Sequence, residues 1–274
     1  MSLQSQYPIK TPLMNVMTST ARKAARGLVR DFGEVANLQV TRKGIMNFVS
    51  EADTKCEQQI HYELKKARPD YGFLMEEGGE EVGKDSSTRW VIDPLDGTTN
   101  FLHAVPYFAI SIAVEKTHSD GTTEITAGVI YDPIHDEMFI AEKGEGAYVN
   151  DQRLRVTERK DSHYFVTGTS RIPSDYTDDS SHMTRYATSQ LECVLRRSGS
   201  AALDLAYVAA GRYDACWFSC LKKWDMAAGI ILVEEAGGEL SRLGTNGDYY
   251  GTGAILAASK NAHKKLKAAH VPAM

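Results

Sequence analysis

Hydrophobic residues recur at helical spacing in the first part of the chain. Thr11 and Pro12 form a suitable N-cap and first helical residue, and apolar positions then repeat every three or four residues. We expect this helix to end at Gly33. A second helix is predicted to begin at residues 50–53, Ser-Glu-Ala-Asp, which have a capping-box pattern, and to end before Pro69.

The hydrophobic period then shortens, which predicts β-strands. Short apolar runs are separated by turn residues, such as Asp-Pro at 132–133 and Gly-Glu-Gly at 144–146. Strands that follow one another so closely form an antiparallel meander. The predicted strands of this part cover residues 73–75, 90–92, 108–114, 128–131, 137–142 and 147–149.

Strands and helices alternate in the second half of the chain, which is typical of a layered α/β fold. We expect an N-terminal α+β lobe over residues 1–150 and a C-terminal α/β lobe over residues 151–274, packed together as one unit. The C-terminal strands are expected at residues 165–167, 194–196, 215–218 and 254–257, and the helices at 176–190, 201–210, 225–236 and 261–269.

Composition and charge limit the possible functions. The chain has 274 residues of which 42% are hydrophobic, enough for a substantial core, and this excludes disordered and low-complexity classes. Its 36 acidic residues outnumber 31 Lys and Arg, so the net charge of −5 disfavours direct nucleic-acid binding. Because no apolar run reaches ~18 residues and the N-terminus lacks a signal core, we expect a soluble cytoplasmic protein with no membrane partner.

The four cysteines are too few for a disulfide framework in a chain of this length. Cys216 and Cys220 have the spacing of a possible metal-binding pair. No second pair of Cys or His lies at zinc spacing, so we interpret them as reduced thiols.

The most informative stretch follows a predicted strand. Asp93 and Asp96 flank Pro94, which we expect to end the strand and to leave both carboxylates close together at its carboxyl end. Gly97 permits close approach of the backbone to a ligand, and Thr98 can open a helix whose free amides favour an anion. Taken alone, the same residues also suit an ordinary β-turn.

Three further acidic residues have a similar context. Glu76 follows a short apolar run, Asp225 begins a strongly apolar helix, and Asp53 lies in the expected capping box. Asp53 and Asp225 also have a structural explanation, as acids in the first turn of a helix.

If these carboxylates meet Asp93 and Asp96 in one cleft, their repulsion becomes large. Two unit charges 4 Å apart repel by ~4 kcal/mol at an effective dielectric of about 20. Such a cluster takes up protons or holds divalent cations, and oxygen ligands without Cys or His suit Mg²⁺. Bound Mg²⁺ presents a positive site to an anion, so the pattern predicts metal-assisted hydrolysis of a phosphate ester.

Two longer motifs resemble the signatures of the inositol monophosphatase family. Residues 93–101, Asp-Pro-Leu-Asp-Gly-Thr-Thr-Asn-Phe, resemble the first signature. Residues 224–229, Trp-Asp-Met-Ala-Ala-Gly, continue through 234–238 and are similar to the second. The resemblance extends from about Ala21 to Ala258 in the family's order, and bacterial SuhB-type members are the most similar.

This resemblance implies the fold and the reaction. It implies a five-layered αβαβα sandwich, usually dimeric, that hydrolyses phosphate monoesters with two or three Mg²⁺ ions and is often inhibited by Li⁺. Glu76 and Glu77 occupy the place of the family's metal-binding Glu pair, and residues 43–53 resemble its mobile N-terminal loop.

The resemblance also implies roles for individual residues. Two Mg²⁺ ions would be bound by Glu76, Asp93, the carbonyl of Leu95, Asp96 and Asp225, and a third, weaker one by Glu76 with or without Asp53. The Thr98 hydroxyl and Glu76 would orient the attacking water, with support from Asp53. The phosphate and the substrate hydroxyls would be met by Asp96, Gly97, Thr98, Gly199, Ser200, Ala201 and Asp225.

One position departs from the family pattern. Phe218 stands where typical members carry a Glu that accepts a hydrogen bond from an inositol hydroxyl. Losing a polar partner changes discrimination between substrates, so we expect a less selective enzyme that also accepts other polyol or sugar phosphates. The structural alternative is that Phe218 fills the core while a neighbour supplies the contact.

Two other functions stay open. Related families hydrolyse bisphosphate nucleotides or fructose bisphosphate, which requires a second phosphate pocket, for which Lys222, Lys223, Arg196 and Arg197 are the candidates. SuhB-type members are also associated with transcription antitermination. A basic helix face with Arg22, Lys23, Arg26 and Arg30 could contact such machinery, although an exposed solvated face is the simpler explanation.

Overall fold

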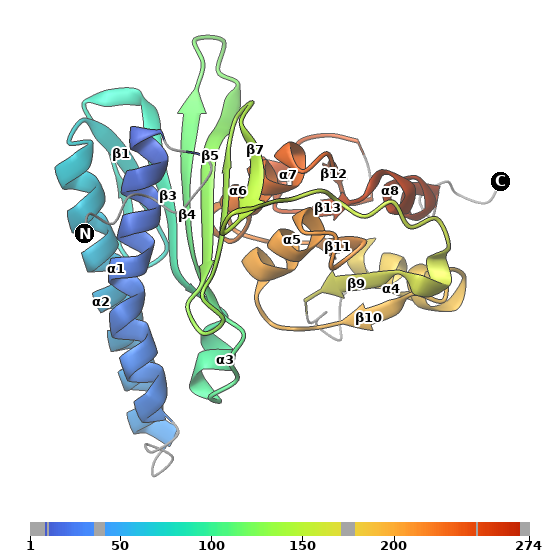
Figure 1. Cartoon of the computed structure of the whole chain (residues 1–274), viewed down its shortest axis with the longest axis horizontal. Coiled ribbons are helices and arrows are strands. Elements are labelled where there is room, and N and C mark those ends of the chain that lie inside the picture. Colours follow the sequence, from blue (N-terminus) through green and yellow to red (C-terminus); the bar gives the residue numbers. More distant parts are fainter. Residues whose placement is uncertain (1–8, 10, 36–41, 171–178, 245, 269–274) are drawn as a thin grey trace.

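Helices and sheets alternate in five layers across the molecule (Figure 1). The computed structural model describes residues 9, 11–35, 42–170, 179–244 and 246–268. This arrangement confirms the predicted αβαβα fold class. The helices are α1 (Pro12–Val35), α2 (Arg42–Ala67), α3 (Thr98–Leu102), α4 (Asp179–Ser189), α5 (Ala201–Ala209), α6 (Lys223–Glu235), α7 (Tyr249–Thr252), α8 (Lys260–Lys267) and the short 3₁₀ turn η1 (Ser162–Tyr164).

The larger sheet contains eight strands in the order β2-β1-β3-β4-β5-β6-β7-β8. Only β1 and β3 pair in parallel, and the strands from β3 to β8 form the predicted antiparallel meander. Its strands are β1 (Tyr71–Met75), β2 (Gly79–Glu81), β3 (Asp85–Asp96), β4 (Ala109–Thr117), β5 (Thr123–Asp132), β6 (Glu137–Glu142), β7 (Gly146–Val149) and β8 (Gln152–Arg153).

The smaller sheet contains five strands in the order β10-β9-β11-β13-β12. The three strands β10, β9 and β11 run parallel, whereas β13 is antiparallel to both of its neighbours. Its strands are β9 (Val166–Thr169), β10 (Val194–Arg196), β11 (Ala215–Phe218), β12 (Glu239–Arg242) and β13 (Ile255–Ala258).

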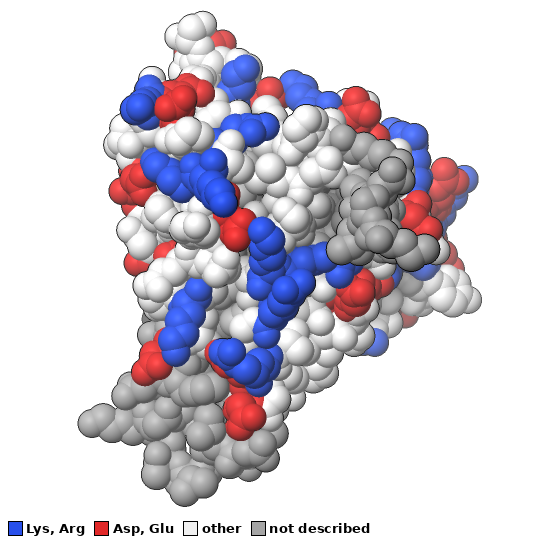
Figure 2. Space-filling model, turned by 60° about the vertical axis from the view of Figure 1, so that its left-hand side comes forward, with Lys and Arg blue, Asp and Glu red and all other residues white. Residues whose placement is uncertain are grey.

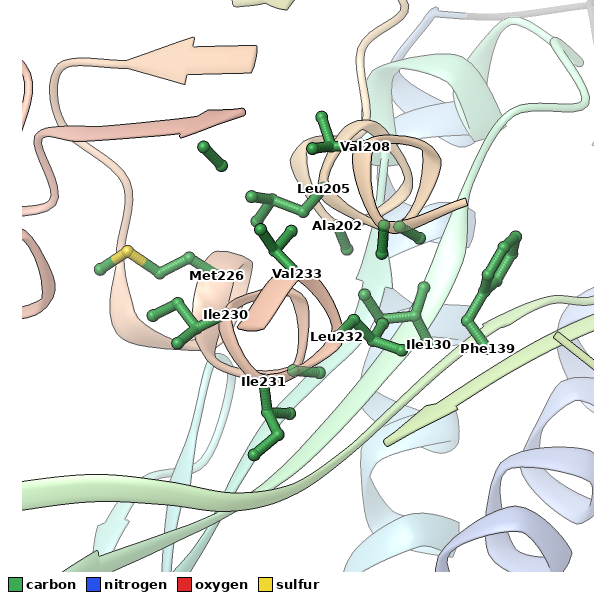
Figure 3. Packing of buried hydrophobic residues seen from close by; sticks show 14 of the residues in the cluster. Ile130, Phe139, Ala202, Leu205, Val208, Met226, Ile230, Ile231, Leu232 and Val233 are labelled. Atoms are coloured by element: carbon green, nitrogen blue, oxygen red, sulfur yellow. The ribbon is translucent and has the colours of Figure 1, made fainter. Parts of the chain in front are cut away.

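Hydrophobic side chains fill the spaces between the layers in three clusters. The first lies between the pair α1 and α2 and the larger sheet, the second between the two sheets around α5 and α6, and the third between the smaller sheet and the outer helices α4 and α8. In the second cluster, Leu205 of α5 and Val233 of α6 point toward each other, and Ile130 and Phe139 of the larger sheet lie across from Leu232 (Figure 3). Helix α6 is therefore buried on all sides.

Both N-terminal helices differ from the prediction at one end. Helix α1 begins at Pro12 as expected but continues past Gly33 to Val35. Helix α2 begins at Arg42, so residues 50–53 lie inside the helix and the predicted capping box is wrong. Residues 43–53 are helical and not a loop. A capping pattern inside a longer helical segment does not by itself begin a helix, because extending a helix that already exists is easier than starting a new one.

Strand β3 does not end at Pro94, which corrects a second prediction. The strand continues to Asp96 through an irregularity, because Asp93 pairs with Ser111 and Asp96 pairs with Ala109 in β4. Two residues of β3 therefore lie opposite fewer residues of β4, which makes a β-bulge. A bulge of this kind accommodates a proline inside a sheet.

Several short elements escaped prediction. The strands β2, β8 and β12 and the helix α7 contain only two to four residues each, too few for a hydrophobic period to identify. The helix predicted from residue 176 is described from Asp179 to Ser189, and residues 176–178 lie outside the described part of the chain. All four cysteines are free thiols. In the described ranges, the helices are too short or too polar to cross a bilayer.

The close packing of α6 on the larger sheet gives a test of the fold. A Cβ atom on Gly128 in β5 would lie 2.8 Å from the Ala228 carbonyl oxygen and 2.6 Å from an Ile231 methyl carbon. We expect Gly128→Ala to lower the free energy of unfolding by about 1–3 kcal/mol, measured by urea denaturation. Gly27→Ala in α1, where nothing lies within 4 Å of the new methyl group, should raise it by up to about 1 kcal/mol. Equal stabilities of the two variants would contradict this packing.

Candidate metal and active site

Glu76 and Asp93 lie at the same edge of the larger sheet. Met75 pairs with Ile92 in the parallel ladder of β1 and β3, and the Glu76 amide donates to the Ile92 carbonyl at 3.3 Å. Asp93 is 1% exposed, and its Oδ1 atom accepts a hydrogen bond from the Leu95 amide at 2.9 Å. The parallel pairing thus brings two acidic residues together that are 17 positions apart in the sequence.

Helix α2 contributes two more buried carboxylates, Asp53 and Glu57, one helical turn apart. The Cys56 thiol between them donates to the Pro94 carbonyl at 3.4 Å, which fixes this turn of α2 against the bulge of β3. Glu57 accepts hydrogen bonds from the Glu77 amide at 3.0 Å and the Gly78 amide at 2.7 Å. Glu57 was missed in the sequence, although its spacing of four residues from Asp53 could have identified it.

Asp225 reaches the site from the first turn of α6. Its Oδ2 atom accepts a hydrogen bond from the Lys222 amide at 2.8 Å, so it also serves as the helix-capping acid that its sequence context allowed. Ser111, which pairs with Asp93 across the sheet, donates to the Trp224 carbonyl at 3.3 Å. This contact fixes the start of α6 at the level of Asp93.

Asp96 connects the larger sheet to the N-terminus of α5. Its Oδ2 atom accepts a hydrogen bond from the Ser200 hydroxyl and another from the Ala202 amide, both at 2.6 Å. Ser200 is also the N-cap of α5. The predicted substrate segment, residues 199–201, therefore lies directly beside Asp96, which is 104 positions away from Ser200.

The turn after Asp96 leads into helix α3 at Thr98, as the sequence predicts. Gly97 has a φ of 107°, in the left-handed region that favours glycine, and it is the N-cap of α3. The Thr98 hydroxyl donates to the Leu95 carbonyl at 3.2 Å. The two predicted functional groups, the hydroxyl and the carbonyl, are thus hydrogen-bonded to each other.

Crowding and burial raise the pKa values of the carboxyl groups. Burial is the main cause for Asp93, whose pKa is well above its usual range, and repulsion from Asp96, Glu76 and Asp225 adds to it. Burial likewise raises the pKa of Asp96 to about 7, and that of Asp53 to about 8 with further repulsion from Glu76. The pKa values of Glu76 and Asp225 are also raised by burial.

The donor groups fit a divalent cation that prefers oxygen. Within the described residues, no three acidic, Cys or His side chains already converge in the geometry of a metal-ligand set. Instead, burial raises the pKa values of Glu76 and Asp93, and the interaction between the two carboxyl groups favours a shared proton. Asp53 has a buried Oδ1 atom without a hydrogen-bond partner. A cation with oxygen ligands would replace the shared proton and partner the free oxygen, so the residues present suit Mg²⁺.

Phe218 does not line this group of carboxylates. It is 2% exposed in β11 and packs in the hydrophobic cluster between the two sheets. The structure therefore supports the view that Phe218 fills the core.

A five-layered sandwich with buried carboxylates at the carboxyl ends of β1 and β3 defines a class of metal-dependent phosphatases. The sequence model of the inositol monophosphatase family matches residues 10–274. The chain belongs to this family and is a phosphoric monoester hydrolase.

Relatives carry two kinds of name. An inositol-1-monophosphatase from Mesorhizobium japonicum is 47% identical, over 94% of this chain and 95% of the relative. A Nus factor SuhB from Pseudomonas aeruginosa is 40% identical, over 93% of this chain and 94% of the relative. The crystal structure of the extragenic suppressor protein suhB from Bartonella henselae has a TM-score of 0.84 and 44% identity, over 96% of this chain and 100% of that one.

The raised pKa values predict how pH and Mg²⁺ act on stability. A buried carboxyl that keeps its proton contributes stability that is complete below pH ~4 and is lost as the pH rises through the folded-state pKa. The melting temperature of the metal-free protein should therefore fall between about pH 5 and about pH 8. Millimolar Mg²⁺ binds the deprotonated form, so it should raise the melting temperature by several degrees at pH 8 and much less at pH 5.

Scanning calorimetry with and without Mg²⁺ measures this effect, and Asp93→Asn is the control. The variant lacks one central carboxylate, so its melting temperature should respond only weakly to Mg²⁺ at pH 8. A response as large in Asp93→Asn as in the wild type, or the same response at both pH values, would contradict the assignment of the cation to this site.

Proposed function

We propose that this protein hydrolyses inositol 1-phosphate or related polyol and sugar phosphates, with Mg²⁺ as its cofactor. The observation that carries the proposal is the group of buried carboxylates from β1, β3, α2 and α6, in a chain that belongs to the inositol monophosphatase family. Relatives named inositol-1-monophosphatase support inositol 1-phosphate as the first substrate to test.

We assign the metal ligands by combining the resemblance with the geometry. One ion would be held by Glu76, Asp93 and the Leu95 carbonyl, and another by Asp93, Asp96 and Asp225. Glu76 would hold a weaker third ion, with the free oxygen of Asp53 as a further ligand. When bound, Mg²⁺ supplies a water of lowered pKa and neutralises charge on the phosphoryl oxygens.

The remaining groups orient the reactants. The Thr98 hydroxyl, which donates to the Leu95 carbonyl, would orient the attacking water together with Glu76. The amides of Gly97 and Thr98 would hold the phosphate in line for displacement, since little covalent chemistry is left for the protein.

The two predicted lobes would contribute different residues to the site. Residues 1–150 would supply most metal ligands, and residues 151–274 would supply Asp225 and the segment 199–201, which meets the hydroxyl groups of the substrate. Asp225 would also contact the leaving oxygen. The homodimer implied by the resemblance remains a prediction, which sedimentation velocity can test.

The prediction of broad substrate selection rests on the residue type at position 218, because the burial of Phe218 in the core is also what its structural alternative expects. An aromatic ring in the core cannot accept a hydrogen bond from a substrate hydroxyl, so this chain lacks the acceptor that typical family members place there. Selection among polyols would then depend on residues 199–201 and Asp225.

A bisphosphate substrate has less support. The Lys223 ammonium lies 3.6 Å from the buried Glu115 carboxylate and 4.6 Å from the Tyr250 ring centre, so it is already occupied. Arg196 donates to the carbonyl of its neighbour Leu195 at 3.3 Å. These contacts engage two of the four candidate cations, Lys223 and Arg196.

A contact with the transcription machinery is the second candidate, favoured by relatives named Nus factor SuhB. On the side of the molecule where α1 and α2 lie, Lys and Arg side chains have Asp and Glu side chains beside them in most places (Figure 2). Arg22 pairs with Asp136 at 2.7 Å and Lys23 with Glu63 at 2.8 Å. Binding to RNA polymerase or Nus factors with negligible phosphatase activity would reverse our preference for the enzyme.

The variant Asp96→Asn tests the catalytic assignment. We expect it to lower kcat on the order of 10²-fold or more at saturating Mg²⁺, because a ligand and a substrate contact are lost together, while circular dichroism shows an intact fold. The matched control is Asp120→Asn in an exposed turn, which should keep full activity. Full activity of Asp96→Asn would remove Asp96 from the mechanism.

A substrate panel tests the breadth of selection. We expect kcat/KM values for inositol 1-phosphate, glycerol 2-phosphate and a hexose phosphate to lie within about tenfold of one another, because the acceptor that would discriminate among them is missing. Phosphate release with and without Mg²⁺ measures these values. A preference for inositol 1-phosphate of several hundredfold would refute broad selection.

A further inference from the structure

A chain of partly buried hydrogen bonds joins the two halves of the sequence outside the carboxylate group. The side-chain amide of Asn100 in α3 donates to the Tyr107 carbonyl at 2.7 Å and to the Ser198 carbonyl at 2.8 Å. Asn100 thus connects the loop before β4 with the loop before α5. The second loop continues directly into residues 199–201.

The loop before α5 lies closely on Asn100. Gly199 has a φ of 93°, and a Cβ atom at this position would be 2.8 Å from the Asn100 amide nitrogen. The next residue, Ser200, donates to Asp96. We call residues 198–201 the strap, and its two ends are fixed by Asn100 and by Asp96.

A hydrogen-bonded tyrosine–aspartate pair also holds the strap region in place. The Tyr107 hydroxyl donates to Oδ1 of Asp204 at 2.9 Å, and Asp204 is 1% exposed. Asp204 is in the first turn of α5, the helix that begins where the strap ends. Its other oxygen comes within 2.8 Å of the position where a Cβ atom on Gly168 would lie, so the carboxylate is enclosed.

The strap has one further partner. The hydroxyl groups of Ser198 and Tyr213 are hydrogen-bonded at 3.0 Å, and the rings of Tyr107 and Tyr213 both meet Tyr207 edge-on, with centres 5.8 and 5.4 Å away. Aromatic packing of this kind keeps the two hydroxyl groups in place.

Packing alone does not explain a buried carboxylate at this position. Burial raises the pKa of Asp204 to about 8, so its charged form is disfavoured. Apolar residues of similar size would usually stabilise a core as well or better. Buried polar groups that are retained at such a position fix one arrangement among several, here the position of α5 and the strap relative to Asp96.

We propose that Asn100, Tyr107 and Asp204 are positioning residues that set the strap against Asp96 and thereby determine how tightly the polyol part of the substrate binds. The inference rests on the proposed function, in which the strap meets the substrate hydroxyls. Because the strap contacts the polyol and not the phosphorus atom, displacing it changes KM for a polyol phosphate. Displacing the strap leaves kcat nearly unchanged, and it also leaves the KM of a substrate without hydroxyl groups nearly unchanged.

The experiment uses Tyr107→Phe, which removes only the hydroxyl group. At saturating Mg²⁺, we expect KM for inositol 1-phosphate to rise about three- to tenfold, as for the loss of one hydrogen bond, with kcat within about twofold. KM and kcat for p-nitrophenyl phosphate should stay within about twofold of the wild type.

The matched control is Tyr131→Phe. Tyr131 also donates to an aspartate at 2.9 Å, Asp136, but on the side of the larger sheet that faces α1. Its kinetics with both substrates should equal those of the wild type. A second pair of variants gives a rescue: Asp204→Asn keeps the acceptor oxygen and should restore a near-normal KM, whereas Asp204→Leu should raise KM for inositol 1-phosphate.

The possible failures are distinguishable. If the wild type hydrolyses inositol 1-phosphate but its KM is unchanged in Tyr107→Phe, or rises equally for p-nitrophenyl phosphate, the positioning role is overturned and the proposed function stands. The same holds if Tyr131→Phe has the same effect or Asp204→Leu behaves like Asp204→Asn. If the wild type hydrolyses no monoester with Mg²⁺, the proposed function fails and this inference fails with it.

Discussion

Electrostatic repulsion among buried carboxylates is the constraint on which the rest of this structure depends. Glu76 and Asp93 lie at the ends of two parallel strands, and burial raises the pKa values of both carboxyl groups. Burial also raises the pKa values of Asp53 and Asp96, and repulsion between neighbouring carboxylates adds to the effect. Such a cluster of carboxyl groups is stable only if the surrounding structure holds it rigidly. It also needs a counter-charge when the carboxyl groups lose their protons. This arrangement supports the proposed binding of cations.

Close packing around α6 and α2 holds the carboxyl groups rigidly in place. A Cβ atom on Gly229 of α6 would lie 2.5 Å from Leu205 of α5. A Cβ atom on Gly128 of β5 would lie 2.8 Å from the Ala228 carbonyl oxygen of α6. Contacts of this closeness leave α6 little freedom to retreat from the sheet, so Asp225 stays near Asp93 despite their repulsion. On the other face, Glu57 fixes the turn after Glu76 through two backbone amides.

The sequence predicted most of this arrangement where local rules decide it. Glu76 and Asp93 follow apolar runs, Thr98 opens a helix after Gly97, and Asp225 lies at the start of an apolar helix; each was found from its own neighbours. The start of α2 was missed because a capping pattern at residues 50–53 is not sufficient to begin a helix. The contacts of Asp96 with Ser200 and of Asn100 with Ser198 join residues about a hundred positions apart, so they depend on how the sheets stack and no local pattern contains them.

The central claim is that these carboxylates hold divalent cations that draw in and activate a phosphate ester. A crystal of the protein soaked in Mn²⁺, with data collected at the manganese absorption edge, tests it most directly. The account predicts anomalous density peaks among the side chains of Glu76, Asp93, Asp96 and Asp225. Anomalous density confined to other parts of the surface, with no peak beside Glu76 or Asp93, would contradict it.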